Sequence, residues 1–155
     1  MDNSVQTETV YRVYEFDSDE YRRGLLLRAE ILRITEGIAD YYVNLVFGLH
    51  DGEKDHIFVG AFRGKNLIGT VSLAPQENGS LMLRQFAVDT KLQGQGIGRK
   101  LIDTAHEAAR ERGFRHIELH ARQNVVGFYE KAGYAPNGKV HSSPSLTTVE
   151  MEREL

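Results

Sequence analysis

The chain contains no cysteine among its 155 residues. This absence excludes disulfide bonds, thiolate metal sites and a cysteine nucleophile. The sequence also lacks an apolar run of the ~18 residues that a membrane-spanning helix needs, and residues 1–10 have neither the basic nor the apolar region of a secretion signal. We therefore expect a cytoplasmic protein that does not bind a membrane.

An excess of positive charge is absent too. The 19 basic residues are outnumbered by 22 acidic ones, for a net charge of −3. Nothing in this balance favours nucleic acid as a partner, so any attraction for anions must be local. No repeat and no Pro-, Gly- or Ser-rich tract divides the chain, which predicts one domain over residues 1–155 with a loose tail at 1–9.

Hydrophobic periodicity predicts alternating helices and strands. Strands are expected at 10–16, 57–62, 67–73, 81–88, 117–121 and 147–151, and helices at about 19–33, 97–112 and 125–132. In the third of these strands Leu67, Gly69, Val71 and Leu73 should share one face, whereas residues 136–138 should turn and 141–145 should form a polar loop. Short turns in the middle of the chain favour an antiparallel meander, and a helical crossover between 88 and 117 requires one parallel pair. The predicted fold class is α+β with a mixed, mostly antiparallel sheet.

The stretch from Leu81 to Lys100 is the most informative part of the sequence, because a strand leads through closely spaced glycines into a helix. A helix that begins near Gly96 leaves its first N–H groups without intrahelical partners and carries roughly +0.5 charge at that end. Glycine allows an anion to approach the backbone closely. We interpret the stretch as a phosphate cradle.

Three other interpretations compete with this one. The glycines could be ordinary turn residues. A dinucleotide site would place an acidic residue about 20 positions beyond the glycines, where Glu118 stands, but its fingerprint is G-x-G-x-x-G and this chain has G-x-G-x-G. A P-loop is excluded because no Gly-Lys-Ser/Thr follows.

Two motifs resemble those of a known superfamily. Residues 93–98, QGQGIG, resemble the Gln/Arg-x-x-Gly-x-Gly/Ala signature of the GNAT N-acetyltransferases, and residues 128–134, FYEKAGY, resemble their second motif. LHARQNVVGFYEKAGY and LLLRAEILR are similar to small bacterial members whose substrates are mostly unassigned. The resemblance covers nearly the whole chain and implies a sheet whose two parallel strands splay apart at the cofactor site.

The same resemblance implies direct transfer of an acetyl group from acetyl-CoA, without a metal, to a primary amine. Backbone N–H groups around the signature would bind the pyrophosphate, and the preceding strand would pair with the pantetheine and stabilise the oxyanion. The implied cofactor-binding residues are Phe86, Ala87, Val88, Gln93, Gly94, Gln95, Gly96, Ile97, Gly98, Arg99 and Lys100. Tyr129, the tyrosine of the second motif, would be the general acid that protonates the departing thiolate.

The base that accepts the amine's proton is not identified by the sequence. His120, His56, Glu36 and solvent water are all candidates. Many family members have Asn seven residues before the motif tyrosine, whereas this chain has Arg122 there and Asn124 two positions later. Arg122 could contact phosphate or an acidic substrate.

Substrate choice is expected in residues 35–55 and 136–145, because loops around a fixed site commonly set specificity. Asp40, Tyr41, Tyr42 and Asp51 could favour a cationic amine. The amine substrate could be a small amine, an antibiotic, an amino acid or a protein N-terminus. The acyl group could be longer than acetyl, and the protein could form a homodimer. A non-catalytic acyl-CoA sensor is the alternative function.

Overall fold

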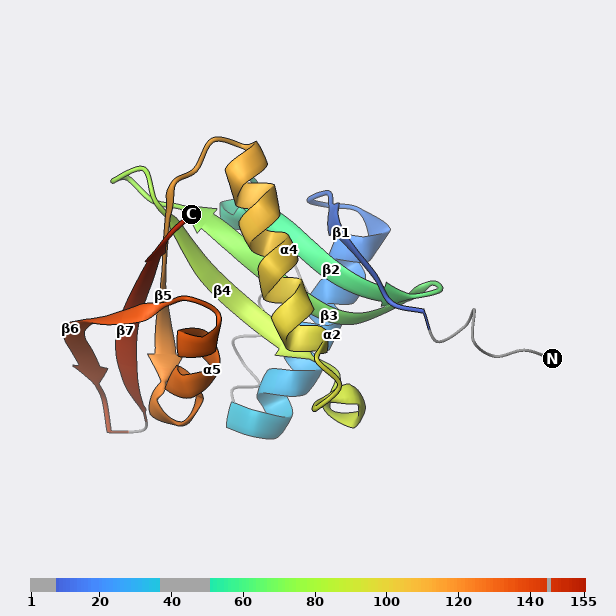
Figure 1. Ribbon diagram of the computed structural model, residues 1–155. Coiled ribbons are helices and arrows are strands. Elements are labelled where there is room, and N and C mark those ends of the chain that lie inside the picture. The colour runs from blue at the N-terminus through green and yellow to red at the C-terminus, as the bar shows by residue number, and fades with distance from the viewer. Residues whose placement is uncertain (1–7, 37–50, 145) are drawn as a thin grey trace.

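The computed structural model describes residues 8–36, 51–144 and 146–155, and these form one mixed sheet with helices on both faces (Figure 1). The strands are β1 (Val10–Tyr14), β2 (Ile57–Arg63), β3 (Asn66–Pro75), β4 (Leu81–Val88), β5 (His116–Arg122), β6 (Ala135–Ser142) and β7 (Thr147–Glu154). The helices are α2 (Asp19–Glu36), α4 (Ile97–Glu111) and α5 (Val126–Lys131), with short 3-10 turns at Asp51–Glu53, Thr90–Leu92 and Gln123–Val125.

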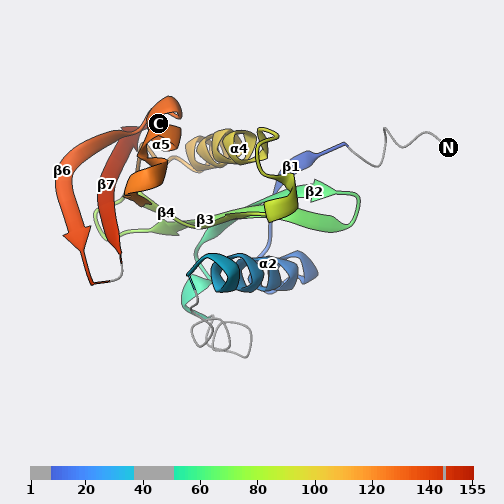
Figure 2. The same cartoon turned by 90° about the horizontal axis from the view of Figure 1, so that it is seen from below.

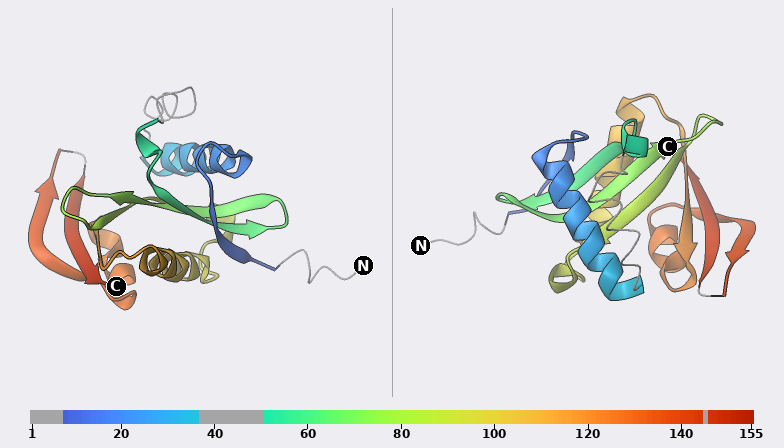
Figure 3. Two further views of the ribbon diagram at one scale, coloured as in Figure 1. Left: turned by 90° about the horizontal axis from the view of Figure 1, so that it is seen from above. Right: turned by 180° about the vertical axis from the view of Figure 1, so that it is seen from behind.

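The strand order is β1-β2-β3-β4-β5-β7-β6. Strands β1 to β4 form an antiparallel meander, α4 carries the chain across, and β4 and β5 are parallel. Figures 2 and 3 show α2 on one face of the sheet and α4 and α5 on the other. The predicted fold class, a mostly antiparallel mixed sheet with one splayed parallel pair, is confirmed.

The main core lies between the sheet and α4. Leu101, Ile102 and Ala105 recur at helical spacing and are fully buried against β-strand residues such as Leu73 and Leu119. A second apolar layer, which includes Tyr21 and Leu25 of α2, covers the opposite face. Helix α4 ends where it was predicted to, because Gly113 adopts a φ of +85° that suits glycine.

A register shift corrects the predicted face of β3. Ala61 pairs with Gly69 and Phe62 with Leu67, so Ile68 is an extra residue in the ladder. One extra residue reverses the alternation of side chains. Gly69, Val71 and Leu73 therefore share one face as predicted, the face toward α4, but Leu67 packs on the α2 side.

The predicted turn at residues 136–138 is wrong, because these residues belong to β6. The ladder with β7 runs from Ala135 to Ser142, and the shift between Pro136 and Val140 accommodates extra residues. Gly138 adopts a φ of +91° within this irregularity. An edge strand tolerates proline, whose missing N–H costs no ladder bond on the outer side. The predicted loop at 141–145 begins later than expected, because His141 and Ser142 still pair with β7. The turn into β7 begins at Ser143, whose N–H donates to the Leu146 carbonyl at 2.8 Å.

Two sequence predictions fall outside the described residues. The expected tail is described only from residue 8, and residues 37–50, which hold most of the first specificity segment, are not described. Across the described ranges, no helix combines the length and the apolar character that crossing a bilayer requires.

Candidate functional site

The parallel strands β4 and β5 pair over a very short distance. Only Leu81 with Ile117 and Met82 with Glu118 are in register in the described part of the chain. Beyond Met82 the two strands diverge, and one edge of β4 faces no neighbouring strand among the described residues. Unpaired backbone N–H and C=O groups at such an edge are available to a ligand.

A β-bulge shapes this same part of β4. Ser72 pairs with Arg84 and Thr70 with Ala87, so Val71 lies opposite two residues, Gln85 and Phe86. Gln85 has a φ of +53°, which is rare outside glycine and marks the distortion. The bulge reverses the alternation, so that Phe86 packs on the α4 side and Ala87 on the α2 side.

The glycine-rich loop ends at the first turn of α4. Gly94 and Gly96 have φ values of +83° and +80°, a conformation that disfavours residues with a Cβ. Gly96 is the N-cap, and Ile97, 3% exposed, anchors the helix start in the core. The carbonyl of Gly96 accepts the first helical hydrogen bond from Lys100, at 3.2 Å, while the preceding N–H groups lack intrahelical partners.

Side-chain hydrogen bonds fix the loop to the sheet. The Gln93 Nε2 donates to the Val88 carbonyl at 3.2 Å, which ties the loop to the end of β4. Arg63, on β2, donates to the Gln95 Oε1 at 3.0 Å. Hydrogen bonds to β2 and β4 therefore hold the glycine loop in place.

An aromatic cluster connects the start of α4 with β4 and α5. A Cβ built on Gly98 would lie 3.1 Å from the Phe86 ring and 3.7 Å from the Phe128 ring, so any larger residue would require the Phe86 ring to shift. The Phe86 and Phe128 rings meet edge to face at 5.8 Å between centroids, and Tyr129 lies 6.5 Å from Phe86. Three segments that are distant in sequence thus meet beside the gap in the sheet.

Tyr129 is half-buried, and burial raises the pKa of its phenol to about 12. The hydroxyl has no hydrogen-bond partner among the described residues. It therefore stays protonated throughout the neutral range and can donate a hydrogen bond to a ligand.

The two basic residues at the start of α4 differ in their surroundings. Arg99 pairs with Asp103 one turn later at 3.2 Å and is 46% exposed, so its charge is partly compensated. Lys100 is exposed and forms no ion pair with the described residues. Both charges lie in the first turn of the helix, where the dipole also favours an anion.

Arg122 and Asn124 lie between β5 and α5. Arg122 ends β5 and caps the 3-10 turn Gln123–Val125, and Asn124 is exposed within that turn. This segment brings the chain from the divergent end of β5 into the helix that carries Tyr129.

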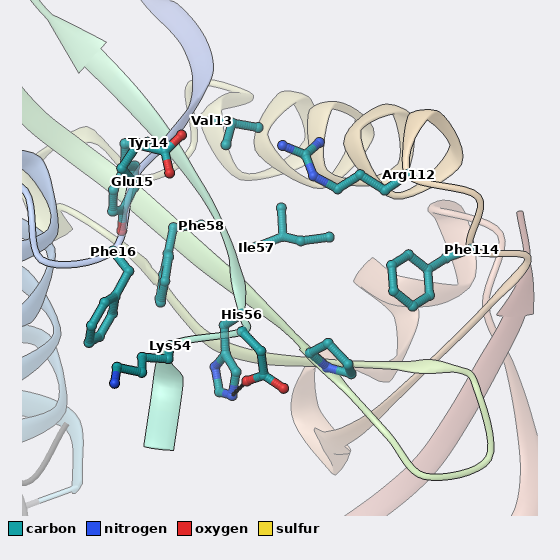
Figure 4. A pocket seen from close by; sticks show the side chains of 12 residues that line it. Val13, Tyr14, Glu15, Phe16, Lys54, His56, Ile57, Phe58, Arg112 and Phe114 are labelled. Atoms are coloured by element: carbon teal, nitrogen blue, oxygen red, sulfur yellow. Dashed lines mark ion pairs between the residues drawn. The ribbon is translucent and has the colours of Figure 1, made fainter. Parts of the chain in front are cut away.

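The three candidate bases do not meet at one place. His56 lines a cavity of about 260 Å³ together with Arg112 and Phe114, at the far end of α4 from the glycine loop (Figure 4). Burial lowers the pKa of its imidazole. Its position argues against a role beside Tyr129. Glu36 ends α2, and its side chain lies outside the described part of the chain. His120 is on β5, with its Nε2 3.3 Å from the Glu150 carboxylate.

Two features of the loop region could not be predicted from the sequence. Arg63 ends a hairpin strand, and nothing in its local sequence indicates that it reaches Gln95, 32 residues later. The bulge at Gln85 has no glycine or proline to mark it. Only the register between β3 and β4 reveals it.

Comparison with known proteins supports the assignment of the fold. A 31% identical relative, the chloroplastic GCN5-related N-acetyltransferase 2 of Arabidopsis thaliana, aligns over 54% of this chain, and the match spans 30% of that protein's length. A candidate N-acetyltransferase from Lactobacillus plantarum is 23% identical with a TM-score of 0.78, over 96% of this chain and 97% of the other.

A similar protein was solved with coenzyme A. The PaiA N-acetyltransferase of Thermoplasma acidophilum, in complex with coenzyme A, is 21% identical with a TM-score of 0.70, over 94% of this chain and 99% of the other. The sequence model of the Acetyltransferase (GNAT) family matches residues 10–134, which is most of the chain. The protein with this divided sheet and glycine-capped helix therefore belongs to the GNAT acetyltransferase family.

Proposed function

We propose that the protein transfers an acetyl group from acetyl-CoA to a primary amine. The observation that carries this proposal is the contact of Gly98 with Phe86 and Phe128, which brings the start of α4, the unpaired edge of β4 and Tyr129 to one place. Family membership and the coenzyme A in the Thermoplasma acidophilum structure support it.

In this proposal the diphosphate lies at the start of α4. Backbone N–H groups between Gln93 and Arg99 would donate to its oxygens, and the helix dipole adds attraction. A Cβ built on Gly94 or Gly96 would meet nothing within 4 Å, so the loop leaves room for a ligand at the backbone. Arg99 and Lys100 supply positive charge beside it.

The unpaired edge of β4 would hold the pantetheine arm. Residues 86–88 offer backbone donors and acceptors where β5 has diverged. An N–H in this stretch would stabilise the carbonyl oxygen of the thioester as it becomes negative, an effect worth about 3 kcal/mol in comparable sites. The side chains of Phe86 and Val88 serve the core, and the function that we assign to them belongs to their backbone.

Tyr129 would act on the sulfur when the tetrahedral intermediate collapses. Its phenol, with a pKa of about 12, is a weaker acid than the coenzyme A thiol at about 8.5. We therefore propose that Tyr129 donates a hydrogen bond that stabilises the departing thiolate. It also relays a proton to the thiolate, and that proton comes from the amine. The amine enters mostly as the ammonium ion and loses two protons. One goes to a base and on to solvent, and the other reaches the thiolate through Tyr129.

The base that accepts the first of these protons is His120 or water. His56 is placed at the wrong end of α4, whereas His120 lies on the strand that borders the gap. If His120 is the base, His120→Ala lowers kcat/KM by about 100-fold, as loss of a general base typically does. If water accepts the proton, kcat/KM of the variant stays at the wild-type level.

The test has two stages. Calorimetry first measures binding of acetyl-CoA, and release of free thiol is then screened over small amines, aminoglycosides, amino acids and peptides with free N-termini. We expect one equivalent of acetyl-CoA to bind and at least one amine class to accelerate thiol release. Tighter binding of NAD than of acetyl-CoA would contradict the proposal.

The alternative function is an acyl-CoA sensor. It would retain the loop and α4 but not turn over, so binding without thiol release across the whole panel would favour it. Longer acyl-CoA thioesters in the same screen establish whether acetyl is the preferred group.

A further inference from the structure

Three side chains with metal-ligating atoms meet on one face of the sheet, far apart in sequence. His120 on β5 lies directly opposite Glu150 on β7, and His141 on β6 pairs with Thr148, two residues from Glu150. Such diagonal neighbours are within reach of long side chains. The ligand atoms of the three residues all lie within 4.8 Å of one another.

This cluster is separate from the acetyl-CoA site proposed above. Ile117, Leu119 and Ala121 alternate with His120 on β5 and are buried in the core that contains α4. His120 therefore projects from the face opposite α4 and α5. Metal binding by this cluster therefore does not need the glycine loop or Tyr129, and it is distinct from the role of His120 as a candidate base.

Glu150 is the centre of the cluster. His120 Nε2 and His141 Nε2 each lie 3.3 Å from its Oε1. Its other oxygen accepts a hydrogen bond from Asn137 Nδ2 and lies 3.9 Å from Lys139 Nζ. A carboxylate whose second oxygen is held by a neighbouring amide is oriented in the way that outer-sphere partners orient metal ligands.

We propose that His120, His141 and Glu150 form a binding site for a divalent transition-metal ion, with Zn²⁺ as the reference ion. Two imidazoles and one carboxylate, with a fourth position open to water, are a donor set that suits Zn²⁺. No metal was expected from the sequence. The three ligands are separated by 20 and 8 residues, a spacing that matches no linear metal motif.

The imidazole rings must turn to bind the ion. They are stacked at 4.6 Å with only 12° between their planes, so their nitrogen lone pairs lie in nearly parallel planes. The side chains are 40% and 50% exposed, which leaves them room to rotate until both nitrogens point at one ion. Glu150, 15% exposed, stays fixed by Asn137.

The experiment is a calorimetric titration of the untagged, chelator-treated full chain with ZnCl₂, without acetyl-CoA. We expect one equivalent to bind. His120→Ala and His141→Ala should each weaken binding at least tenfold, and Asn137→Ala by about tenfold, as loss of outer-sphere partners typically does. Cobalt provides a second readout, because tetrahedral Co²⁺ bound at the site should give visible absorption bands. These bands should be absent from the double histidine variant, which carries both His120→Ala and His141→Ala.

His116→Ala is the matched control. His116 is on the same face of the same strand and lies 3.6 Å from Glu152 and 3.9 Å from Glu154, but no second histidine of the described residues joins it. Its variant should bind Zn²⁺ like the wild type. Absence of saturable binding, unchanged affinity in the double histidine variant, or an equal loss in His116→Ala would overturn the proposal. Circular dichroism of each variant verifies the fold, and because acetyl-CoA is omitted, the result is independent of the proposed transferase activity.

Discussion

At the scale of single residues, two neighbouring tyrosines have opposite surroundings. The rings of Tyr129 and Tyr134 lie 5.8 Å apart, and burial raises the pKa of both. The Tyr134 hydroxyl is 2.7 Å from His106 Nε2, whereas that of Tyr129 has no partner in the described part of the chain. The Tyr134 hydroxyl is thus already used inside the fold, whereas the Tyr129 hydroxyl can still donate to a ligand.

Tyr129→Phe tests this difference. We expect wild-type thermal stability and acetyl-CoA affinity but a turnover lower by about 10- to 100-fold, because proton transfer by a positioned group typically contributes that much or more. The measurements are thermal melting, calorimetry and thiol release with the amine found in the screen. Unchanged turnover would remove Tyr129 from the mechanism.

Tyr134→Phe is the control for that experiment. It leaves the buried His106 Nε2 without its partner and should lower the free energy of unfolding by about 1–3 kcal/mol. Turnover per folded molecule should stay at the wild-type level.

At the scale of elements, the start of α4 depends on the left-handed conformation of Gly96. Gly96→Ala meets no steric contact within 4 Å but forces alanine into a φ of +80°. We expect a loss of about 1–2 kcal/mol in the free energy of unfolding and weaker acetyl-CoA binding, because the strain is relieved by moving the N–H groups of the loop. Urea denaturation and calorimetry measure the two effects.

Gly127→Ala provides the matched comparison. Gly127 is inside α5, has no neighbour within 4 Å of a built Cβ and does not have a positive φ. Alanine there should raise stability by up to about 1 kcal/mol through helix propensity. If both variants behaved alike, the left-handed conformation would not be the cause.

Elements with a strong local signal could be predicted, and those defined by pairing could not. Apolar periodicity and glycine located α4 closely, and the alternation of Ile117, Leu119 and Ala121 located β5. The β6 strand was missed because Pro136 and Gly138 are typical of turns, and only pairing with β7 makes that segment a strand. The bulges at Ile68 and Gln85 arise from mismatched strand registers, which no single strand encodes.

In the candidate site, too, residues with a local sequence motif could be predicted, and those defined by the topology could not. Gly98 and Tyr129 could be named from motifs, and the structure brings their segments together through Phe86 and Phe128. The histidines could not be sorted, because imidazoles on different strands look alike in sequence. Only the topology separates His56, at the far end of α4, from His120 beside β4.

At the scale of the whole molecule, a buried histidine makes stability depend on pH. His106 on α4 is 2% exposed. Its Nε2 contacts Tyr134 and its Nδ1 lies 3.2 Å from Arg153 on β7. Desolvation, and then the charge of Arg153, lower its pKa to about 4. Because Arg153 can only donate, the neutral ring carries its proton on Nε2 and gives it to Tyr134.

The sign of the effect follows from that depressed pKa. In the unfolded state His106 becomes protonated below a pKa of about 6.5, whereas in the folded state it stays neutral down to about pH 4. Stability from this group is complete above pH 6.5 and should fall by roughly 3 kcal/mol as the pH drops to 4. Urea denaturation between pH 7 and 4 should show this fall.

His106→Gln should flatten the change over the same interval, although its stability at pH 7 is lower. Acidic groups whose pKa is also lowered, such as Glu53, add a decline that both proteins share. An identical pH slope in the variant and the wild type would show that His106 is not the titrating group.

The short pairing of β4 with β5 has one more consequence. Among the described residues, two pairs in the strand ladder join a four-stranded half of the sheet, β1 to β4, to a three-stranded half, β5 to β7. A small rotation of one half about this joint changes the width of the gap without breaking a hydrogen bond inside either half. Strand hydrogen bonds therefore constrain the angle between the half-sheets only weakly, and we expect whatever occupies the gap to set it.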